Sequence, residues 1–175
     1  MSYLGFIRDN FRFIGFGILM MGFSSFGQTF FIALFNPDLM AHFNLNNAEI
    51  GGIYSIATLV SAFLLIWTGP FVDRVALPRF AGFVTLGLAL SCLVMSFASH
   101  VVILFLAFLL LRHFGQGLTM HTAGTAIARA YDKNRGRAVA LTGIGLPLGE
   151  GFFPLIAVLL AGWVGWQTSW LYFAV

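Results

Sequence analysis

Long apolar runs alternate with short polar stretches along the chain. A helix needs about 20 predominantly apolar residues to cross a hydrocarbon core of ~30 Å. We therefore predict five complete membrane-spanning helices, at about residues 13–35, 50–68, 80–98, 101–128 and 138–161. A sixth run begins near residue 168, and its part within the sequence extends only about 12 Å as a helix. We expect a single transmembrane domain over residues 1–175 that is truncated inside its sixth helix.

The stretches between the runs contain residues that commonly end membrane helices. Residues 36–38 combine Asn, Pro and Asp, and the polar stretch 39–49 that follows has no Lys or Arg. Glycine and proline punctuate 69–79, and 99–100 is short enough for a tight hairpin. Residues 162–166 pair two glycines with two tryptophans, as is typical of a turn at a membrane interface. These breaks predict that consecutive helices are antiparallel.

The composition supports the same fold class. Hydrophobic residues make up 59% of the chain and charged residues 9%, whereas about a quarter of a soluble domain is charged. Mean hydropathy is +0.93. These values exclude a soluble globular domain and predict an all-α polytopic bundle of transmembrane helices in a lipid bilayer. The single cysteine, Cys92, excludes an intrachain disulfide.

The basic residues indicate topology. Eight of the nine Lys and Arg residues lie in the stretches 8–12, 74–79 and 129–137, which alternate with the predicted outer turns. Such stretches mark the cytoplasmic side of a membrane protein. We therefore predict a cytoplasmic N-terminus, in a cytoplasmic (inner) membrane. The formal net charge of +3 then reflects topology, and no nucleic-acid partner is expected.

The ninth basic residue, Arg112, lies inside a predicted span, about 16 Å from its outer end at 1.5 Å per residue. Glu150, the only acid within a span, lies about 18 Å from the inner end of the next antiparallel helix. The two are therefore expected at similar depth and within reach of each other. Intramembrane ionisable groups usually mark transport pathways, so we expect them to bind substrate or a coupling proton. The alternative is a buried ion pair that only fixes helix register.

Uncharged polar residues at similar depth extend this candidate site. Gln28 in the first span and Gln116, one turn after Arg112, are expected to line the same cavity. At 100° per residue, His113 and His121 lie about 80° apart, and His121 faces away from Arg112. Each histidine therefore has two open interpretations, a proton relay or a packing residue. No histidine lies in a second span to ligate haem, and no metal set or clustered nucleophile and base is present, so we expect no cofactor, no metal and no enzymatic activity.

Three segments together resemble the major facilitator superfamily of secondary transporters. The turn at 69–79 resembles that family's signature of Gly, three residues and Asp-Arg, followed by a second Gly and paired basic residues. Ala76 and Pro78 depart from it. In the family this turn is a conformational latch between helices two and three on the cytoplasmic side. The resemblance implies a latch made of Gly69, Asp73, Arg74 and Arg79. The alternative for the two arginines is that they only anchor the topology.

The fourth and fifth spans carry the other two segments. Residues 112–117 resemble the family's arginine and spaced glycines, where the arginine takes part in proton coupling or substrate binding. Residues 143–151 are similar to the glycine-proline signature of the fifth helix, although Glu150 stands where a small residue is more usual. The helix-packing positions that this implies are Gly115, Gly117, Gly145, Pro147 and Gly149.

The resemblance covers nearly the whole chain and implies the N-terminal half of a fold built of two six-helix halves. We expect transmembrane transport of a small solute by alternating access. A cation in the cavity favours an organic anion, unless Glu150 neutralises Arg112. The expected partners are the small-molecule substrate, a coupling proton and a missing C-terminal half. A non-transporting membrane scaffold or assembly subunit is the alternative.

Overall fold

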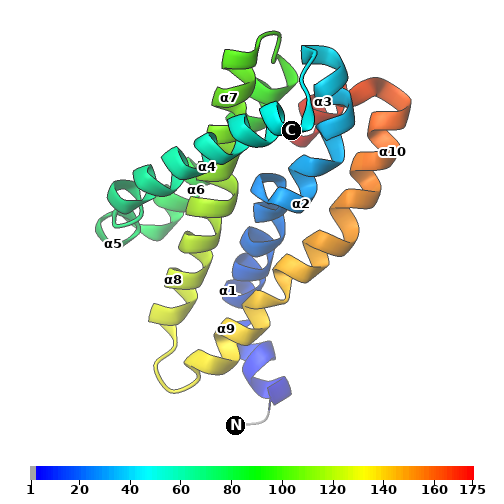
Figure 1. Ribbon diagram of the computed structural model, residues 1–175. Coiled ribbons are helices and arrows are strands. Elements are labelled where there is room, and N and C mark those ends of the chain that lie inside the picture. The colour runs from blue at the N-terminus through cyan, green and yellow to red at the C-terminus, as the bar shows by residue number, and fades with distance from the viewer. Residues whose placement is uncertain (1–2) are drawn as a thin grey trace.

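The structure is a computed structural model that describes residues 3–175, with side chains from Gly5 onward. Throughout this range the protein is helical and has no strand (Figure 1). Four helical stretches are long and apolar enough to cross a membrane, and a bent pair of helices makes a fifth candidate. The predicted all-α fold class is confirmed.

The first crossing is broken, where the sequence predicted one helix over 13–35. Its elements are α1 (Tyr3–Phe23), the 3-10 turn η1 (Ser24–Gly27), α2 (Thr29–Ile32), the 3-10 turn η2 (Ala33–Phe35) and α3 (Asn36–Phe43). Gln28 has an extended backbone, with φ −82° and ψ 151°, and the two parts on either side of it are bent by 46°. The prediction that 36–38 ends the helix was wrong. Pro37 lies in the first turn of α3, where its missing N–H leaves no bond unmade.

The second and third crossings follow the predicted runs closely. α4 spans Asn47–Thr68, the short α5 Phe71–Arg74 and α6 Leu77–Ser96. α4 begins three residues before its predicted start because of its cap. The Asn46 side chain accepts from the backbone N–H of Ala48 and Glu49, and the Glu49 carboxylate accepts from the N–H of Asn46 at 2.8 Å. This reciprocal cap satisfies donors that the start of a helix otherwise leaves free.

The fourth crossing contains an uncommon element. α7 (Val101–Leu110) leads into η3 (Leu111–Thr119), which is a π-helix, and then into α8 (Met120–Ala130). The sequence predicted one regular helix over 101–128. Two glycines inside η3 weaken the α-helical preference, and the Thr119 hydroxyl donates to the carbonyl of Phe114, five residues earlier, at 2.6 Å. π-Helical turns are rare and often occur at functional sites.

The last crossing consists of α9 (Arg135–Gly143) and α10 (Gly145–Phe173). Within α10 the backbone leaves the helical region at Gly165, with φ 78° and ψ 163°, a conformation that glycine adopts without strain. In Figure 1 the orange part of α10 rises to this bend and the red part turns back behind α3. The turn predicted at 162–166 is therefore a sharp bend, and the helix predicted from residue 168 follows it.

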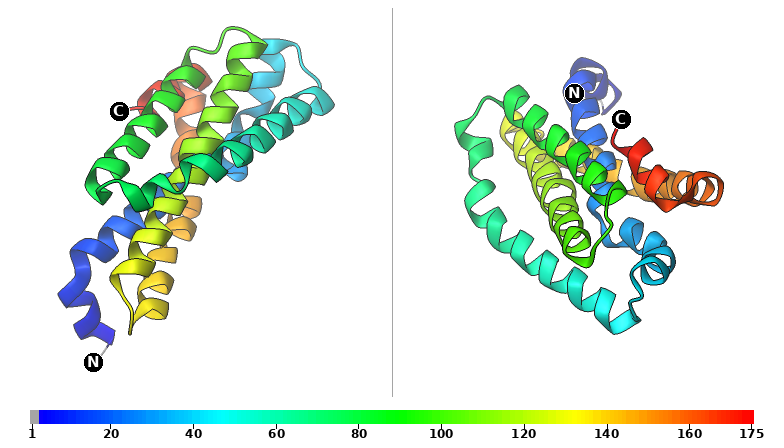
Figure 2. Two further views of the ribbon diagram at one scale, coloured as in Figure 1. Left: turned by 90° about the vertical axis from the view of Figure 1, so that its left-hand side faces the viewer. Right: turned by 90° about the horizontal axis from the view of Figure 1, so that it is seen from above.

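The helices pack around the middle of the fourth crossing. α1 contacts α8, α9 and α10, while α4 and α6 both contact α7 and η3. The view from above in Figure 2 shows α4 running along the outside of this group. After the Gly165 bend, Trp170 is fully buried, and its ring lies 5.6 Å from that of Phe31 and 5.0 Å from that of Phe35. This aromatic contact joins the end of α10 to the part of the first crossing that follows Gln28.

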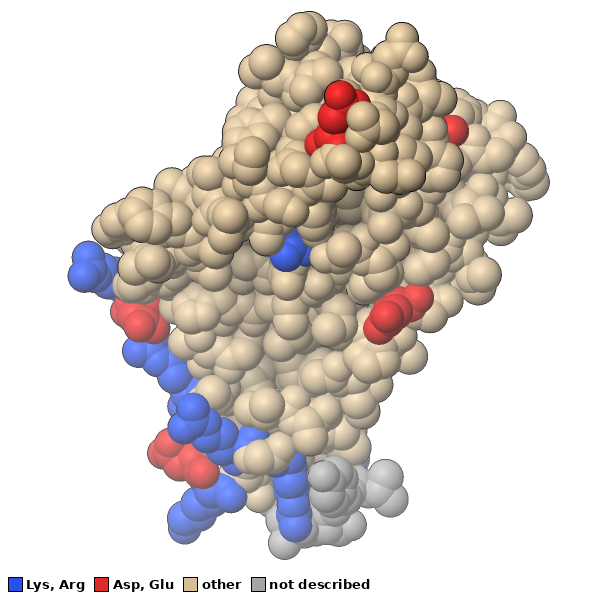
Figure 3. Space-filling view, viewed as in Figure 1, with Lys and Arg blue, Asp and Glu red and all other residues tan. Residues whose placement is uncertain are grey.

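Charged side chains concentrate at one end of the bundle. Figure 3 shows most of the visible Lys and Arg side chains toward the lower end, near the N-terminus and the α8–α9 turn labelled in Figure 1. The stretch 74–79 follows α4, and 129–137 joins α8 to α9. The fold therefore separates a basic end from the end that carries α3 and the start of α7.

Candidate functional site

Arg112 reaches from η3 to the break in the first crossing. Its Nη1 donates to the carbonyl oxygen of Gly27 at 3.1 Å and to the hydroxyl of Thr29 at 3.4 Å. Gly27 is the last residue of η1, where backbone carbonyls lack partners within the helix. A charged donor makes a stronger hydrogen bond than a neutral one. Arg112 therefore stabilises the broken conformation of the first crossing.

Tyr54 of α4 completes this arrangement. The guanidinium carbon of Arg112 lies 5.4 Å from the centre of the Tyr54 ring, a cation–π distance. The Tyr54 hydroxyl is 2.7 Å from the Thr29 hydroxyl. We call Arg112, Gly27, Thr29 and Tyr54 the Arg112 cluster. Thr29 and Tyr54 are also polar side chains within apolar runs, but the sequence favoured Gln28 and Gln116 as the cavity liners.

The ion pair between Arg112 and Glu150, which the sequence left open as an alternative, is not formed among the described residues. Glu150 is exposed on α10, and over residues 5–175, whose side chains are described, no ion pair involves it. The two residues were expected within reach of each other because they lie at similar depth, but depth along a helix does not fix the direction of a side chain. Arg112 points toward the first crossing and α4, and α10 contributes nothing to its cluster.

The two glutamines predicted to line the cavity differ in their contacts. Gln28 donates from Nε2 to the sulfur of Met120 at 3.0 Å. The Oε1 of Gln116 is buried without a hydrogen-bond partner among the described residues, and so are the Nε of Arg112 and the hydroxyl of Thr58 on α4. A buried unpaired polar atom costs about 1–3 kcal/mol unless water or a ligand satisfies it. The surroundings of η3 are therefore short of hydrogen-bond partners.

Both histidines of the fourth crossing face α4. Nδ1 of His113 lies 3.4 Å from the carbonyl of Ser61, and its Nε2 lies 3.3 Å from the hydroxyl of Thr68. His121 lies beside Gly69 at the end of α4. A Cβ built on Gly69 would lie 3.5 Å from Nε2 of His121. The sequence placed the two rings about 80° apart because it assumed α-helical geometry. The wider turns of the π-helix bring them to the same side.

Close backbone contacts bring the Arg112 cluster together. A Cβ on Gly27 would lie 2.7 Å from the Cα of Gly115, and a Cβ on Gly115 would lie 2.6 Å from the Cα of Gly27. Real Cβ atoms do not approach that closely, so both positions require glycine. The contact places η1 directly on η3. Arg112 reaches the Gly27 carbonyl because these two segments touch.

The remaining predicted packing positions vary in tightness. A Cβ on Gly145 would collide with the Ile18 carbonyl of α1, and one on Gly149 would lie 2.6 Å from the Gly22 carbonyl. Gly117 is less crowded, since the nearest Leu65 atom would be 3.4 Å away. Pro147 is exposed in the first turn of α10. The signature of the fifth crossing thus places α10 against α1.

The segment predicted as a latch contains an ion pair. Asp73 Oδ1 lies 2.7 Å from Nη1 of Arg129, at the end of α8, and both side chains are about half exposed. Gly69 is buried, while Arg74 and Arg79 are exposed and have no ion pair among the described residues. The sequence assigned Arg129 to topology alone. Arg129 and Asp73 have opposite charges and were both predicted at the same membrane face, which was the available signal for this pairing.

A comparison with protein families matches residues 17–175 to the Major Facilitator Superfamily. The match includes η1, η3, the Asp73 turn and the glycines that join α1 to α10. No curated protein and no solved structure matches the chain. Among the described residues, no three His, Cys, Asp or Glu side chains lie together in a way that suits a metal ion.

Proposed function

Because the chain belongs to the major facilitator superfamily, whose members are membrane transporters rather than enzymes, we propose that it carries a small organic anion by alternating access. The observation that carries this proposal is the Arg112 cluster. The cluster places a positive charge inside a candidate membrane span, beside a broken helix. In the described structure this charge forms no ion pair with an acidic residue. Because no ion pair joins Glu150 to Arg112 in the described structure, the charge of Arg112 supports an anionic substrate.

Arg112 has donors to spare for a substrate. Among the described residues, only its Nη1 has a hydrogen-bond partner, and its Nε is buried and unpaired. A guanidinium offers a planar set of N–H groups that matches the two oxygens of a carboxylate. A carboxylate bound to the free donors shares the guanidinium with the Gly27 carbonyl, which stays on Nη1. Substrate binding is then coupled to the conformation of the broken first crossing.

The bundle is one wall of the transport pathway in this proposal. A second bundle of the family's fold faces the Arg112 cluster, and the two rock about it. The Asp73–Arg129 pair, with Gly69, Arg74 and Arg79, belongs to the latch at the cytoplasmic end, beside a cytoplasmic N-terminus in an inner membrane. Gln28 and Gln116 contact the solute or a coupling proton once the cavity opens.

Uptake into proteoliposomes tests the role of Arg112. Radiolabelled small carboxylates are compared with their uncharged amides, using wild type, Arg112→Lys and Arg112→Ala, each in a protein that carries both bundles. We expect Arg112→Ala to reduce carboxylate uptake about 100-fold, since losing a charge-assisted hydrogen bond to a buried anion costs about 3 kcal/mol. Arg112→Lys retains the charge but loses the planar donors, so its uptake is intermediate.

Thr58→Val is the matched control, because it removes a buried polar atom of α4 without changing any charge. Its uptake should stay close to wild type. Equal uptake of the carboxylate and the amide by wild type would contradict an anion transporter, and so would unchanged uptake by Arg112→Ala.

The bond from Arg112 to Gly27 also favours a second function, that of a non-transporting scaffold. In that case Arg112 only holds the first crossing in shape. Arg112→Ala should lower the Tm in either case, so uptake by wild type separates the two. A scaffold predicts no uptake of any tested solute by wild type.

A further inference from the structure

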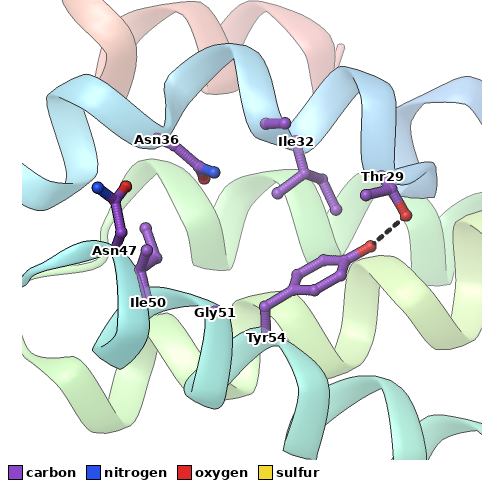
Figure 4. Close-up of a pocket in the computed structure, with 8 residues that line it drawn as sticks. Thr29, Ile32, Asn36, Asn47, Ile50, Gly51 and Tyr54 are labelled. Atoms are coloured by element: carbon purple, nitrogen blue, oxygen red, sulfur yellow. Dashed lines mark hydrogen bonds between the residues drawn. The ribbon is translucent and has the colours of Figure 1, made fainter.

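A polar pocket lies between the outer part of the first crossing and the start of α4. Its volume is about 120 Å³, and its lining includes Thr29, Asn36, Asn47, Gly51 and Tyr54. Figure 4 shows the two asparagine side chains directed into the gap between the helices, with the Thr29–Tyr54 hydrogen bond at the other end. An apolar cavity of about 150 Å³ accepts benzene, so this pocket suits a molecule slightly smaller than that.

The lining provides hydrogen bonds without charge. No hydrogen bond involves the amide of Asn36 or of Asn47 in the described structure, so both can serve a ligand. Each amide has two N–H donors and an acceptor, and Thr29 and Tyr54 add hydroxyls. Ile32 and Ile50 close the sides with apolar surface. The pocket therefore suits a small solute that has both a polar head and an apolar part.

The inner end of the pocket adjoins Arg112. The Thr29 hydroxyl is 2.7 Å from that of Tyr54 and accepts from Arg112 at 3.4 Å. The Tyr54 ring also lies against the guanidinium. Two side chains of the pocket thus belong to the Arg112 cluster as well. The hydrogen bond between them separates the pocket from the arginine.

We propose that this pocket is an outer subsite for a small carboxylate such as glycolate, and that the Thr29–Tyr54 hydrogen bond is the gate between it and Arg112. This inference rests on the proposed transport of an organic anion. The carboxylate first accepts hydrogen bonds from the pocket amides. It then accepts from the hydroxyls of Thr29 and Tyr54, whose own hydrogen bond breaks. The same oxygens then reach the guanidinium.

Cysteine labelling of the protein in proteoliposomes tests the subsite. Gly51→Cys places a thiol in the pocket, and an added Cβ there meets nothing within 4 Å. The native Cys92 is fully buried, so it gives little background. We expect glycolate at ~10 times its Kd to slow iodoacetamide labelling about tenfold by mass action, while glycolamide has little effect. Asn47→Ala in the same background should reduce this protection.

Equal protection by glycolate and glycolamide, or no protection by either, would overturn the subsite. Gln116→Cys reports on the inner site in the same assay. Glycolate protection at Gln116→Cys without protection at Gly51→Cys leaves the proposed function standing and removes only the outer subsite. Protection at Gly51→Cys alone supports the subsite and counts against Arg112 as the transport site.

The gate has its own test. Tyr54→Phe keeps the ring beside Arg112 and removes the hydroxyl that bonds Thr29. We expect externally added iodoacetamide to label Gln116→Cys several-fold faster in this background. Thr58→Val, one helical turn further along α4, is the control and should leave the rate unchanged. An unchanged rate in Tyr54→Phe would exclude the gate.

Discussion

Arg112 has a structural role that its contacts show, and the proposed function gives it a binding role as well. Its Nη1 bonds to the carbonyl of Gly27, and the plane of its guanidinium lies near the Tyr54 ring. Both contacts offset the cost of a charge at membrane depth. The buried Nε has no partner among the described residues, so part of this cost persists until a ligand or water binds.

Glu150→Gln is a prediction at this scale. The residue is exposed and has no ion pair in the described structure, so we expect the Tm to change by less than ~2 °C and uptake to persist. Thermal unfolding in detergent and uptake in proteoliposomes check this. The double variant with Arg112→Ala should behave like the single Arg112 variant. Rescue of Arg112→Ala by Glu150→Gln would show that the two charges interact.

The break in the first crossing and the π-helix depend on each other at the scale of elements. η1 and η3 touch through Gly27 and Gly115, and Arg112 bonds across the same contact. Neither feature was indicated by hydrophobic periodicity. Apolar runs show how long a span is, whereas breaks and π-turns arise where neighbouring segments supply the missing hydrogen bonds.

Gly115→Ala tests this contact. A methyl group there would fall within 2.7 Å of the Gly27 backbone, so the two segments must separate. We expect a loss of about 1–3 kcal/mol in the free energy of unfolding, from overpacking. Gly124→Ala on α8 is the matched control, because nothing lies within 4 Å of its added Cβ. Equal stability of the two alanine variants in a denaturant titration would contradict the close packing.

The two ends of the whole molecule differ in chemistry. The basic end contains the Asp73–Arg129 pair, which ties α5 to the end of α8, whereas the other end has the polar pocket and the aromatic contact around Trp170. Alternating access needs one end to open as the other closes. A pair that is half exposed is weak enough to break and re-form during such a cycle.

Asp73→Asn is the prediction at the molecular scale. An exposed ion pair contributes about 0.2–1 kcal/mol, so the Tm should change little. If the pair belongs to the latch, the transport rate should change much more than the stability does. The charge-swapped double variant, Asp73→Arg with Arg129→Asp, should restore part of the rate. A transport rate that changes in step with the Tm in both variants would assign the pair to stability alone.

The sequence by itself determined the all-α fold class, the approximate position of each span and the grouping of basic residues. These depend on composition and run length, which the cost of burying charges and backbone groups in lipid controls directly. The three motifs also indicated the family that the match over residues 17–175 shows. The tertiary structure alone decided what Arg112 contacts. Depth along a helix can be counted from the sequence, but the direction of a side chain depends on local winding and on where neighbouring backbones touch. For that reason Arg112 bonds to the Gly27 carbonyl instead of Glu150.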